Sequence, residues 1–214
     1  PRLQLAQQLG EGASGVIYRA RLDGAEDVAV KVFKGAMTSD GLPRSEMAAC
    51  VSAGPHANLI SILGTLDGHP QGAAGLVMPL IDPAFRNMAG PPSLVSCTRD
   101  VYADGARFDV AQVLAIAHGI ASAVRQLHAR GIAHGDLYAH NILHADSGAC
   151  LLGDFGAASL FEPGSPQADV LQGIEARAFG VLLGELVAHC VTSMPTLQAM
   201  LDACLQEETT RRPN

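Results

Sequence analysis

Residues 134–141 read His-Gly-Asp-Leu-Tyr-Ala-His-Asn, and Asp-Phe-Gly follows at residues 154–156. The first stretch holds an aspartate, Asp136, five positions before an asparagine, Asn141. It is followed by two short apolar runs at residues 142–144 and 150–153, which predict short strands. Both polar stretches therefore fall in loops beside strands, where chemically active side chains are often found.

A long helix is predicted immediately before the first stretch. Asp109 and Gln112 form a capping-box pattern at its start, and apolar residues recur at helical spacing from Val110 to Leu127. Two more helices are predicted near residues 175–190 and 195–206. The second part of the chain is therefore expected to be mainly helical.

The first part of the chain has the alternating pattern of strands. It predicts strands at residues 3–9, 15–21, 27–33, 59–66 and 75–80, with a short helix near 44–52. A strand-rich part followed by a helix-rich part predicts an α+β fold with two lobes and a boundary near residues 79–83.

A glycine-rich run, Gly-Glu-Gly-Ala-Ser-Gly at residues 10–15, lies between the first two predicted strands. A dinucleotide-binding fold would enter a helix after the third glycine, but residues 16–18 continue as a strand. The run therefore fits a hairpin turn lying over phosphates, and an ordinary glycine-rich hairpin is the alternative. The next strand carries Val-Ala-Val-Lys at residues 28–31, and Lys31 is one of only two lysines against twelve arginines.

Taken together, these motifs resemble the protein kinase family, in the family's order along the chain. Residues 175–183 are similar to the helix that contains Phe-Gly-Val-Leu-Leu, and Arg212-Pro213 to the closing Arg-Pro. The resemblance implies a bilobal fold with a β-rich N-lobe at residues 1–81 and a helical C-lobe at 82–214. The activation segment is then short, the C-terminal helices are truncated, and the His-Gly-Asp loop indicates a minimal bacterial member.

The resemblance assigns roles to the polar residues. Asp136 would accept the proton of the attacking hydroxyl, and Lys31 would hold the α- and β-phosphates of ATP with Glu46 orienting it. Asn141 and Asp154 would bind Mg²⁺, which prefers few protein ligands together with phosphate oxygens and water. The expected cofactors are therefore ATP and Mg²⁺.

The nucleotide site is carried over in the same way. The phosphates would lie under the three glycines, the ring between three apolar residues, and the adenine edge against the hinge, where Met78 is the gatekeeper. The carbonyl of Pro79 would accept from the adenine amino group, and the N–H of Ile81 would donate. The expected contacts are Gly10, Gly12, Gly15, Ile17, Ala29, Lys31, Met78, Pro79, Ile81 and Leu143.

Several positions depart from the family pattern. Gly135 replaces the arginine that usually receives an activation-segment phosphate, and residues 154–175 contain no Thr, Tyr or Ala-Pro-Glu. We therefore predict a kinase that is not switched on by phosphorylation there, where only Ser159 and Ser165 could be modified. Glu175 stands where the family usually has aspartate, and this departure casts doubt on the surface that would hold the protein substrate. Tyr138 and His140 occupy the positions where a lysine or arginine separates serine/threonine kinases from tyrosine kinases. Neither residue fits either pattern, so the amino acid that would accept the phosphate stays open.

Composition restricts the partners. The chain has 214 residues, and the 48% of them that are hydrophobic argue against disorder. The net charge of −7 argues against nucleic acid as a partner, because phosphate binding requires clustered Lys and Arg. No apolar run reaches the roughly 18 residues of a membrane helix, so no membrane segment is expected. Five cysteines without a Cys-x-x-Cys pair indicate reduced, buried thiols and a cytoplasmic location.

Three functions are compatible with these motifs. The first is an active protein kinase acting on a protein substrate, with the chain itself as one candidate. The His-Gly-Asp form also resembles aminoglycoside and choline phosphotransferases, which act on small molecules. A nucleotide-binding or scaffolding pseudokinase is the third: the short loops and the missing Ala-Pro-Glu support it, whereas the intact Lys31, Asp136, Asn141 and Asp154 count against it. The loop is also similar to bacterial kinase domains attached to leucine-rich repeats, so fusion to other domains outside this chain stays open.

Overall fold

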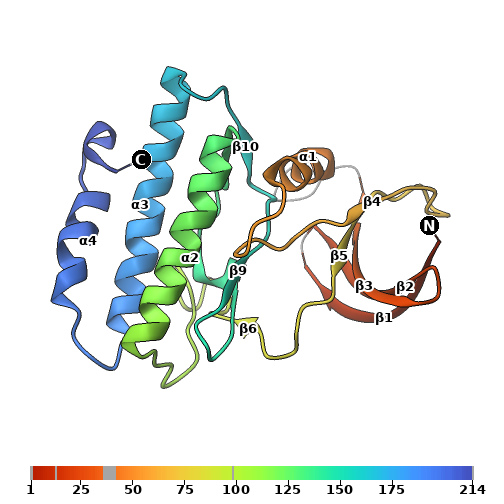
Figure 1. Ribbon diagram of the computed structural model, residues 1–214, viewed down its shortest axis with the longest axis horizontal. Helices are drawn as coiled ribbons and strands as arrows, with labels where there is room; N and C mark the ends of the chain where they lie inside the picture. The colour runs from red at the N-terminus through yellow and green to blue at the C-terminus, as the bar shows by residue number, and fades with distance from the viewer. Residues whose placement is uncertain (1, 13, 36–41, 98, 214) are drawn as a thin grey trace.

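The protein has a β-sheet part and a helical part, with helix α1 between them, as Figure 1 shows for a computed structural model. The structure describes residues 2–12, 14–35, 42–97 and 99–213. The expected α+β fold, with a strand-rich first part and a mainly helical second part, is confirmed. The expected lobe boundary at residue 81 falls in the connection between β5, which ends at Pro79, and β6, which begins at Arg86.

Five antiparallel strands form the sheet in the order β1-β2-β3-β5-β4. Their bounds are β1 Leu3–Glu11, β2 Gly15–Leu22, β3 Glu26–Phe33, β4 Gly64–Leu66 and β5 Gly75–Pro79. Because side chains alternate along a strand, β3 directs Val28, Val30 and Val32 to one face and Ala29 and Lys31 to the other. The valines form a small core with Ala20 and Val77, so the face of Ala29 and Lys31 is left toward the helical part.

Helix α1 (Pro43–Ala53) covers the inner side of the sheet and is fixed at its C-terminal end by α2. Nε2 of Gln126 donates to the carbonyls of Ala53 at 2.8 Å and Pro55 at 3.1 Å, and Nη1 of Arg130 donates to the carbonyl of Ser52 at 3.0 Å. These bonds satisfy carbonyls that a helix leaves unpaired at its end. They attach the C-terminal end of α1 to the end of α2.

The helical part is built on α2 (Val110–Ala129), α3 (Pro166–Ala188) and α4 (Gln198–Cys204). Short strands and 3₁₀ turns complete it: β6 Arg86–Asn87, β7 Ile132–Ala133, β8 Ile142–His144, β9 Cys150–Leu152, β10 Ser159–Leu160, η1 Ala139–Asn141, η2 Pro195–Leu197 and η3 Thr209–Arg211. The expected capping box is present, since Oδ1 of Asp109 accepts from the N–H of Gln112 at 2.7 Å.

Two predicted elements differ from the structure. The strand predicted at 59–66 is reduced to β4, because residues 58–60 leave the sheet and pair with β9: the N–H of Ile60 donates to the carbonyl of Leu152 at 3.0 Å. Helix α3 begins at Pro166, nine residues earlier than predicted, because Oγ of Ser165 caps it by accepting from the N–H of Ala168.

Helix α2 meets the length and composition expected of a membrane-spanning helix, contrary to the expectation from the sequence. Core helices of water-soluble proteins meet the same test. Here Val113, Ile116, Ile120 and Leu127 are completely buried in the main core of the helical part. We therefore assign α2 to the core.

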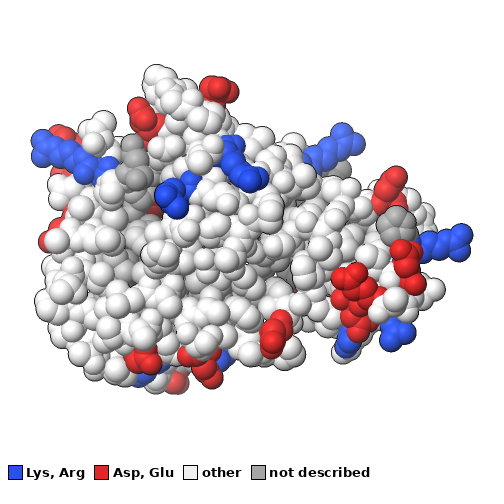
Figure 2. All heavy atoms as spheres, viewed as in Figure 1, with Lys and Arg blue, Asp and Glu red and all other residues white. Residues whose placement is uncertain are grey.

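Charged and thiol side chains complete the description. Figure 2 shows the Lys, Arg, Asp and Glu residues scattered mainly around the rim of the viewed face, with a broad uncharged area over the helical part.

Of the five cysteines, Cys50, Cys150 and Cys204 are buried and Cys190 is partly buried. Cys97 is exposed, so the prediction of buried thiols is wrong at that position.

Candidate active site

A cavity of about 810 Å³ lies between the sheet and the helical part. The inner face of the sheet supplies one wall, because Ile17 pairs with Lys31 and Ala29 pairs with Met78 in neighbouring strands. Leu143 of β8 lines the opposite side. The expected nucleotide and metal residues that line the cavity are Ile17, Ala29, Met78, Pro79, Ile81, Asn141, Leu143 and Asp154. Such an apolar slot with a few polar groups at one end suits a planar ring bearing a charged tail.

Lys31 and Glu46 lie together at the inner face of the sheet. Nζ of Lys31 is 2.5 Å from Oε1 of Glu46, and their side chains are 13% and 5% exposed. The pairing forms because α1 presents Glu46 toward the face of β3 on which Lys31 lies. One turn further along α1, burial and then the negative charge of Glu46 raise the pKa of Cys50 to about 12, so its thiol stays protonated.

Asp136 and Asn141 are joined by hydrogen bonds. Nδ2 of Asn141 donates to Oδ2 of Asp136 at 2.8 Å and to its carbonyl oxygen at 3.0 Å. This leaves the other side-chain atom of Asn141, Oδ1, available as a ligand for a cation. The Asp136 side chain is held at the surface of the loop by the asparagine that follows it five residues later.

The loop before Asp136 is anchored by a completely buried histidine. Nε2 of His134 donates to the carbonyl of Gly153 at 2.9 Å, and its Nδ1 accepts from the N–H of Asp136 at 3.3 Å. Phe155 packs against the ring, with centroids 5.0 Å apart. His134 thus ties Asp136 to the Asp154-Phe155-Gly156 turn.

Asp154 occupies a left-handed backbone conformation, with φ of 57°. Its Oδ1 accepts from the N–H of Gly156 at 3.2 Å, which stabilises this turn, and the residue lines the cavity beside Asn141. Carboxylate and amide oxygens are the donors that Mg²⁺ prefers, and it retains several non-protein ligands. Asn141 and Asp154 therefore fit a magnesium ion bound together with phosphates.

The three glycines differ in what the fold requires of them. A Cβ at Gly15 would lie 2.6 Å from the carbonyl oxygen of Val32, so packing requires glycine there. A Cβ at Gly10 or Gly12 would meet nothing within 4 Å. These two positions are therefore not dictated by packing, which is consistent with space kept for a ligand. Ala13 of this run lies outside the described residues, and the glycines do not line the 810 Å³ cavity.

The model of the protein kinase domain matches residues 3–188 of this chain. The chain belongs to the protein kinase family. Its kinase domain is similar to the serine/threonine-protein kinase mos of Gallus gallus, with 27% identity over 177 residues that cover 78% of this chain and 50% of the relative.

Other relatives include a bacterial kinase. The serine/threonine-protein kinase A-Raf of Mus musculus is 27% identical over 165 residues, 74% of this chain and 24% of the relative. The DNA damage-responsive serine/threonine-protein kinase RqkA of Deinococcus radiodurans is 30% identical over 169 residues, 75% of this chain and 23% of the relative. The chain thus spans half or less of the length of these kinases.

The structure of the kinase domain explains why residue 135 is glycine and not the arginine that is usual in the family. This residue has φ of 79°, and a Cβ there would lie 2.3 Å from the carbonyl oxygen of Ala157, so an arginine would not fit without a shift of backbone. Its N–H donates to Oε1 of Glu175 at 2.9 Å, while Oε2 of Glu175 accepts from Nε2 of His128 at 2.6 Å. Glu175 therefore supports the loop of Asp136 from α3.

Sequence reasoning missed several residues of the cavity. Arg19 follows Ile17 by two positions on β2 and therefore lies on the same face of the strand. The alternation of side chains along a strand could have predicted its place in the cavity wall. Asp82 and His140 also line the cavity. Lys31, Glu46 and Asp136 are not among its lining residues, so the Lys31–Glu46 pair and Asp136 lie beside the cavity rather than in its wall.

Proposed function

We propose that this chain is an ATP·Mg²⁺-dependent protein kinase domain that phosphorylates serine or threonine hydroxyls of proteins. The Lys31–Glu46 ion pair carries the proposal, because it forms beside a cavity lined by Asn141 and Asp154. The three relatives given above are all named serine/threonine-protein kinases, which supports serine or threonine as the residue that accepts the phosphate.

The residues divide the reaction between them. Lys31, held by Glu46, would bind the α- and β-phosphates, and Asn141 and Asp154 would hold Mg²⁺, which supplies neutralisation of phosphate charge. The acceptor oxygen attacks the γ-phosphorus and the bond to the β–γ bridging oxygen breaks, so that ADP leaves with the electron pair. The hydroxyl proton passes to the carboxylate of Asp136. Most of the rate gain would come from positioning and electrostatics.

Transfer to protein is the direct test. The protein is incubated with γ-labelled ATP and Mg²⁺, with and without casein, and labelled residues are identified by phosphoamino-acid analysis. We expect label on serine or threonine of casein or of the chain itself. ATP binding with no label on protein would reject the proposal in favour of a pseudokinase or a small-molecule phosphotransferase, and transfer of label to an added small alcohol would identify the latter.

We further propose that activity does not depend on phosphorylation of the segment between Asp154 and α3. The N–H of Phe161 donates to the carbonyl of Gly131 at 2.8 Å, and Ser159 pairs with Ala133. These backbone bonds order the segment without a phosphate. No arginine stands at residue 135 to receive one.

Replacing both serines of this segment should therefore leave the rate unchanged. Ser159→Ala is combined with Ser165→Asn, because asparagine keeps a good cap for α3 but carries no hydroxyl. We expect a transfer rate within about twofold of wild type, since no phosphate-binding charge pair is removed. Mass spectrometry of the wild-type protein provides the control. Stoichiometric phosphate at either serine, together with a large rate loss in the double variant, would contradict the prediction.

A further inference from the structure

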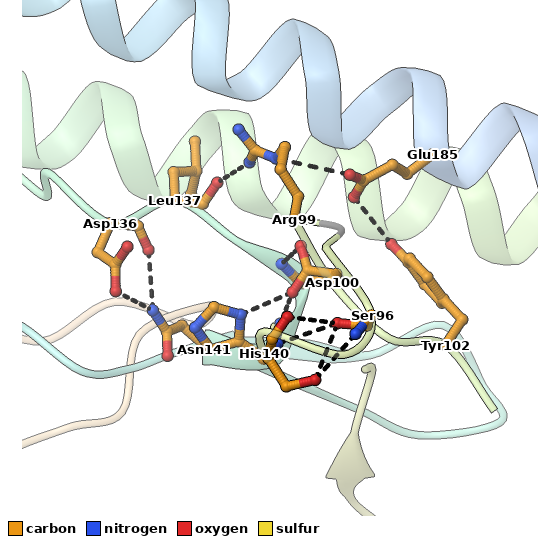
Figure 3. Close-up of polar contacts among 11 residues, drawn as sticks. Ser96, Arg99, Asp100, Tyr102, Asp136, Leu137, His140, Asn141 and Glu185 are labelled. Carbon is orange, nitrogen blue, oxygen red and sulfur yellow. Dashed lines mark hydrogen bonds and ion pairs between the residues drawn. The ribbon is translucent and has the colours of Figure 1, made fainter. Parts of the chain in front are cut away.

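A short segment, Arg99–Tyr102, lies against the loop that carries Asp136 and Asn141 (Figure 3). It belongs to residues 83–108, whose sequence pattern predicts no regular element. Within the described residues of that stretch, regular structure is limited to β6, an antiparallel bridge between Gly90 and Val101 and a parallel bridge between Phe108 and Cys190. The contacts of this segment are therefore made by individual side chains.

The carboxylate of Asp100 is buried and fully engaged by the loop. Its side chain is 1% exposed. Oδ2 accepts from the N–H of Ala139 at 3.1 Å, and Oδ1 accepts from the N–H of His140 at 2.9 Å and from Nδ1 of His140 at 2.6 Å. Burying a carboxylate is unfavourable unless hydrogen bonds compensate for the lost water. The three donors supply that compensation, and all three come from two adjacent residues of the loop.

These contacts fix the turn that holds Asn141. Ala139, His140 and Asn141 form the 3₁₀ turn η1, so the residue next to the two bound by Asp100 is the proposed Mg²⁺ ligand. Asn141 in turn donates to the carboxylate of Asp136 at 2.8 Å. Hydrogen bonds thus join Asp100 to η1 and Asn141 to Asp136, and the backbone of η1 connects the two sets (Figure 3).

Arg99 fastens the same segment at a second point. Its Nη2 donates to the carbonyl of Leu137 at 2.9 Å, and its guanidinium carbon lies 3.9 Å from the centre of the Tyr138 ring. Nε of Arg99 is 3.5 Å from Oε1 of Glu185 in α3, whose Oε2 accepts from Tyr102 at 3.2 Å. The segment therefore connects the loop to α3 and leaves Asp100 little freedom to move.

We propose that Asp100 is a positioning residue for phosphoryl transfer, which sets the orientation of Asn141 and thereby the affinity for Mg²⁺. The inference rests on the proposed function. Residues that orient a metal ligand without touching the metal commonly change metal affinity or activity about 10–100-fold when replaced. Asp100 reaches Asn141 only through the backbone of η1, so its replacement should affect the metal more than the adenine end of the cavity.

The experiment compares Mg²⁺ dependence with metal-free binding. Affinity for ADP is measured by calorimetry in EDTA and across a Mg²⁺ titration, for wild type, Asp100→Ala and Asp100→Asn. In EDTA we expect unchanged affinity. The Mg²⁺ concentration at half-maximal effect should rise about tenfold or more in Asp100→Ala. Asp100→Asn should lie between the two, because it retains one oxygen acceptor for the N–H of His140. The transfer rate at low Mg²⁺ should follow the same order.

Asp146→Asn is the matched control, since the carboxylate of Asp146 also contacts another side chain, that of Arg86, but is 83% exposed and outside the cavity lining. It should match wild type. Wild-type Mg²⁺ dependence in both Asp100 variants would overturn the proposal. Equal losses of ADP affinity with and without Mg²⁺ would overturn it too, because they indicate a general structural tether. If Asp100→Ala does not fold, the near-isosteric Asp100→Asn decides. A wild-type protein that transfers no phosphate would refute the proposed function. The Mg²⁺ dependence of ADP affinity would still decide whether Asp100 sets the affinity for Mg²⁺.

Discussion

Replacing Asp136 by asparagine is expected to lower the rate of phosphoryl transfer by about 10²–10⁴-fold, while nucleotide binding stays unchanged. Asparagine has the shape of aspartate and keeps an oxygen that can accept from Nδ2 of Asn141, so the loop should retain its geometry. It has no carboxylate to take the proton of the attacking hydroxyl. The expected loss is therefore chemical rather than structural.

The Asp136 prediction is tested with single-turnover kinetics and γ-labelled ATP, alongside calorimetric affinity for ADP·Mg²⁺. Asp146→Asn again serves as the control, because it makes the same substitution at an exposed site. A large fall in the rate with wild-type ADP affinity is the expected result. An Asp136→Asn protein that transfers phosphate at the wild-type rate would remove Asp136 from the mechanism.

The second large effect is expected at Lys31. Lys31→Met should lower kcat/KM for ATP about 100-fold or more, because it removes a cation aimed at developing phosphate charge in a site of low exposure. The chain should remain folded, since methionine fills a similar volume at the inner face of β3. Full activity of this variant would refute the phosphate role.

Glu46 allows the Lys31 effect to be resolved into its parts. If Glu46 acts by orienting Lys31, Glu46→Gln should lower kcat/KM less than Lys31→Met, and the double variant should resemble Lys31→Met rather than the product of both losses. Additive losses would show that the two residues act independently. Lys34→Met, at the exposed second lysine, is the control for thermal stability, and its unfolding temperature should change least.

The sequence predicts the fold and the main polar residues because local patterns carry both. Strand alternation places Ala29 and Lys31 on one face, and the capping box defines the start of α2. The motifs around Asp136 and Asp154 are short, so their residues stay close in space whatever the rest of the chain does. Their relative placement in the structure follows from these local elements packing together.

Other features depend on contacts between distant segments, which local patterns do not encode. The strand predicted at residues 59–66 is shortened because residues 58–60 pair with β9, more than 90 positions later. Asp100 lies in a stretch without periodicity, and its importance is visible only once its carboxylate meets η1. Glu175 supports the loop through Gly135, a contact 40 residues apart in sequence. Burial and side-chain direction, not residue type, decide these roles.

The brevity of the segment from Phe155 to Ser165 has a thermodynamic consequence. Ordering a residue's backbone costs about 1–2 kcal/mol of conformational free energy, and the closure cost of a loop grows with its length. Here both ends are fixed, by the turn at Asp154 and by the cap of α3, and the middle pairs with β7. We expect the segment to order as part of the folding reaction, so heating should abolish its ordered arrangement and the native state of the domain in one transition.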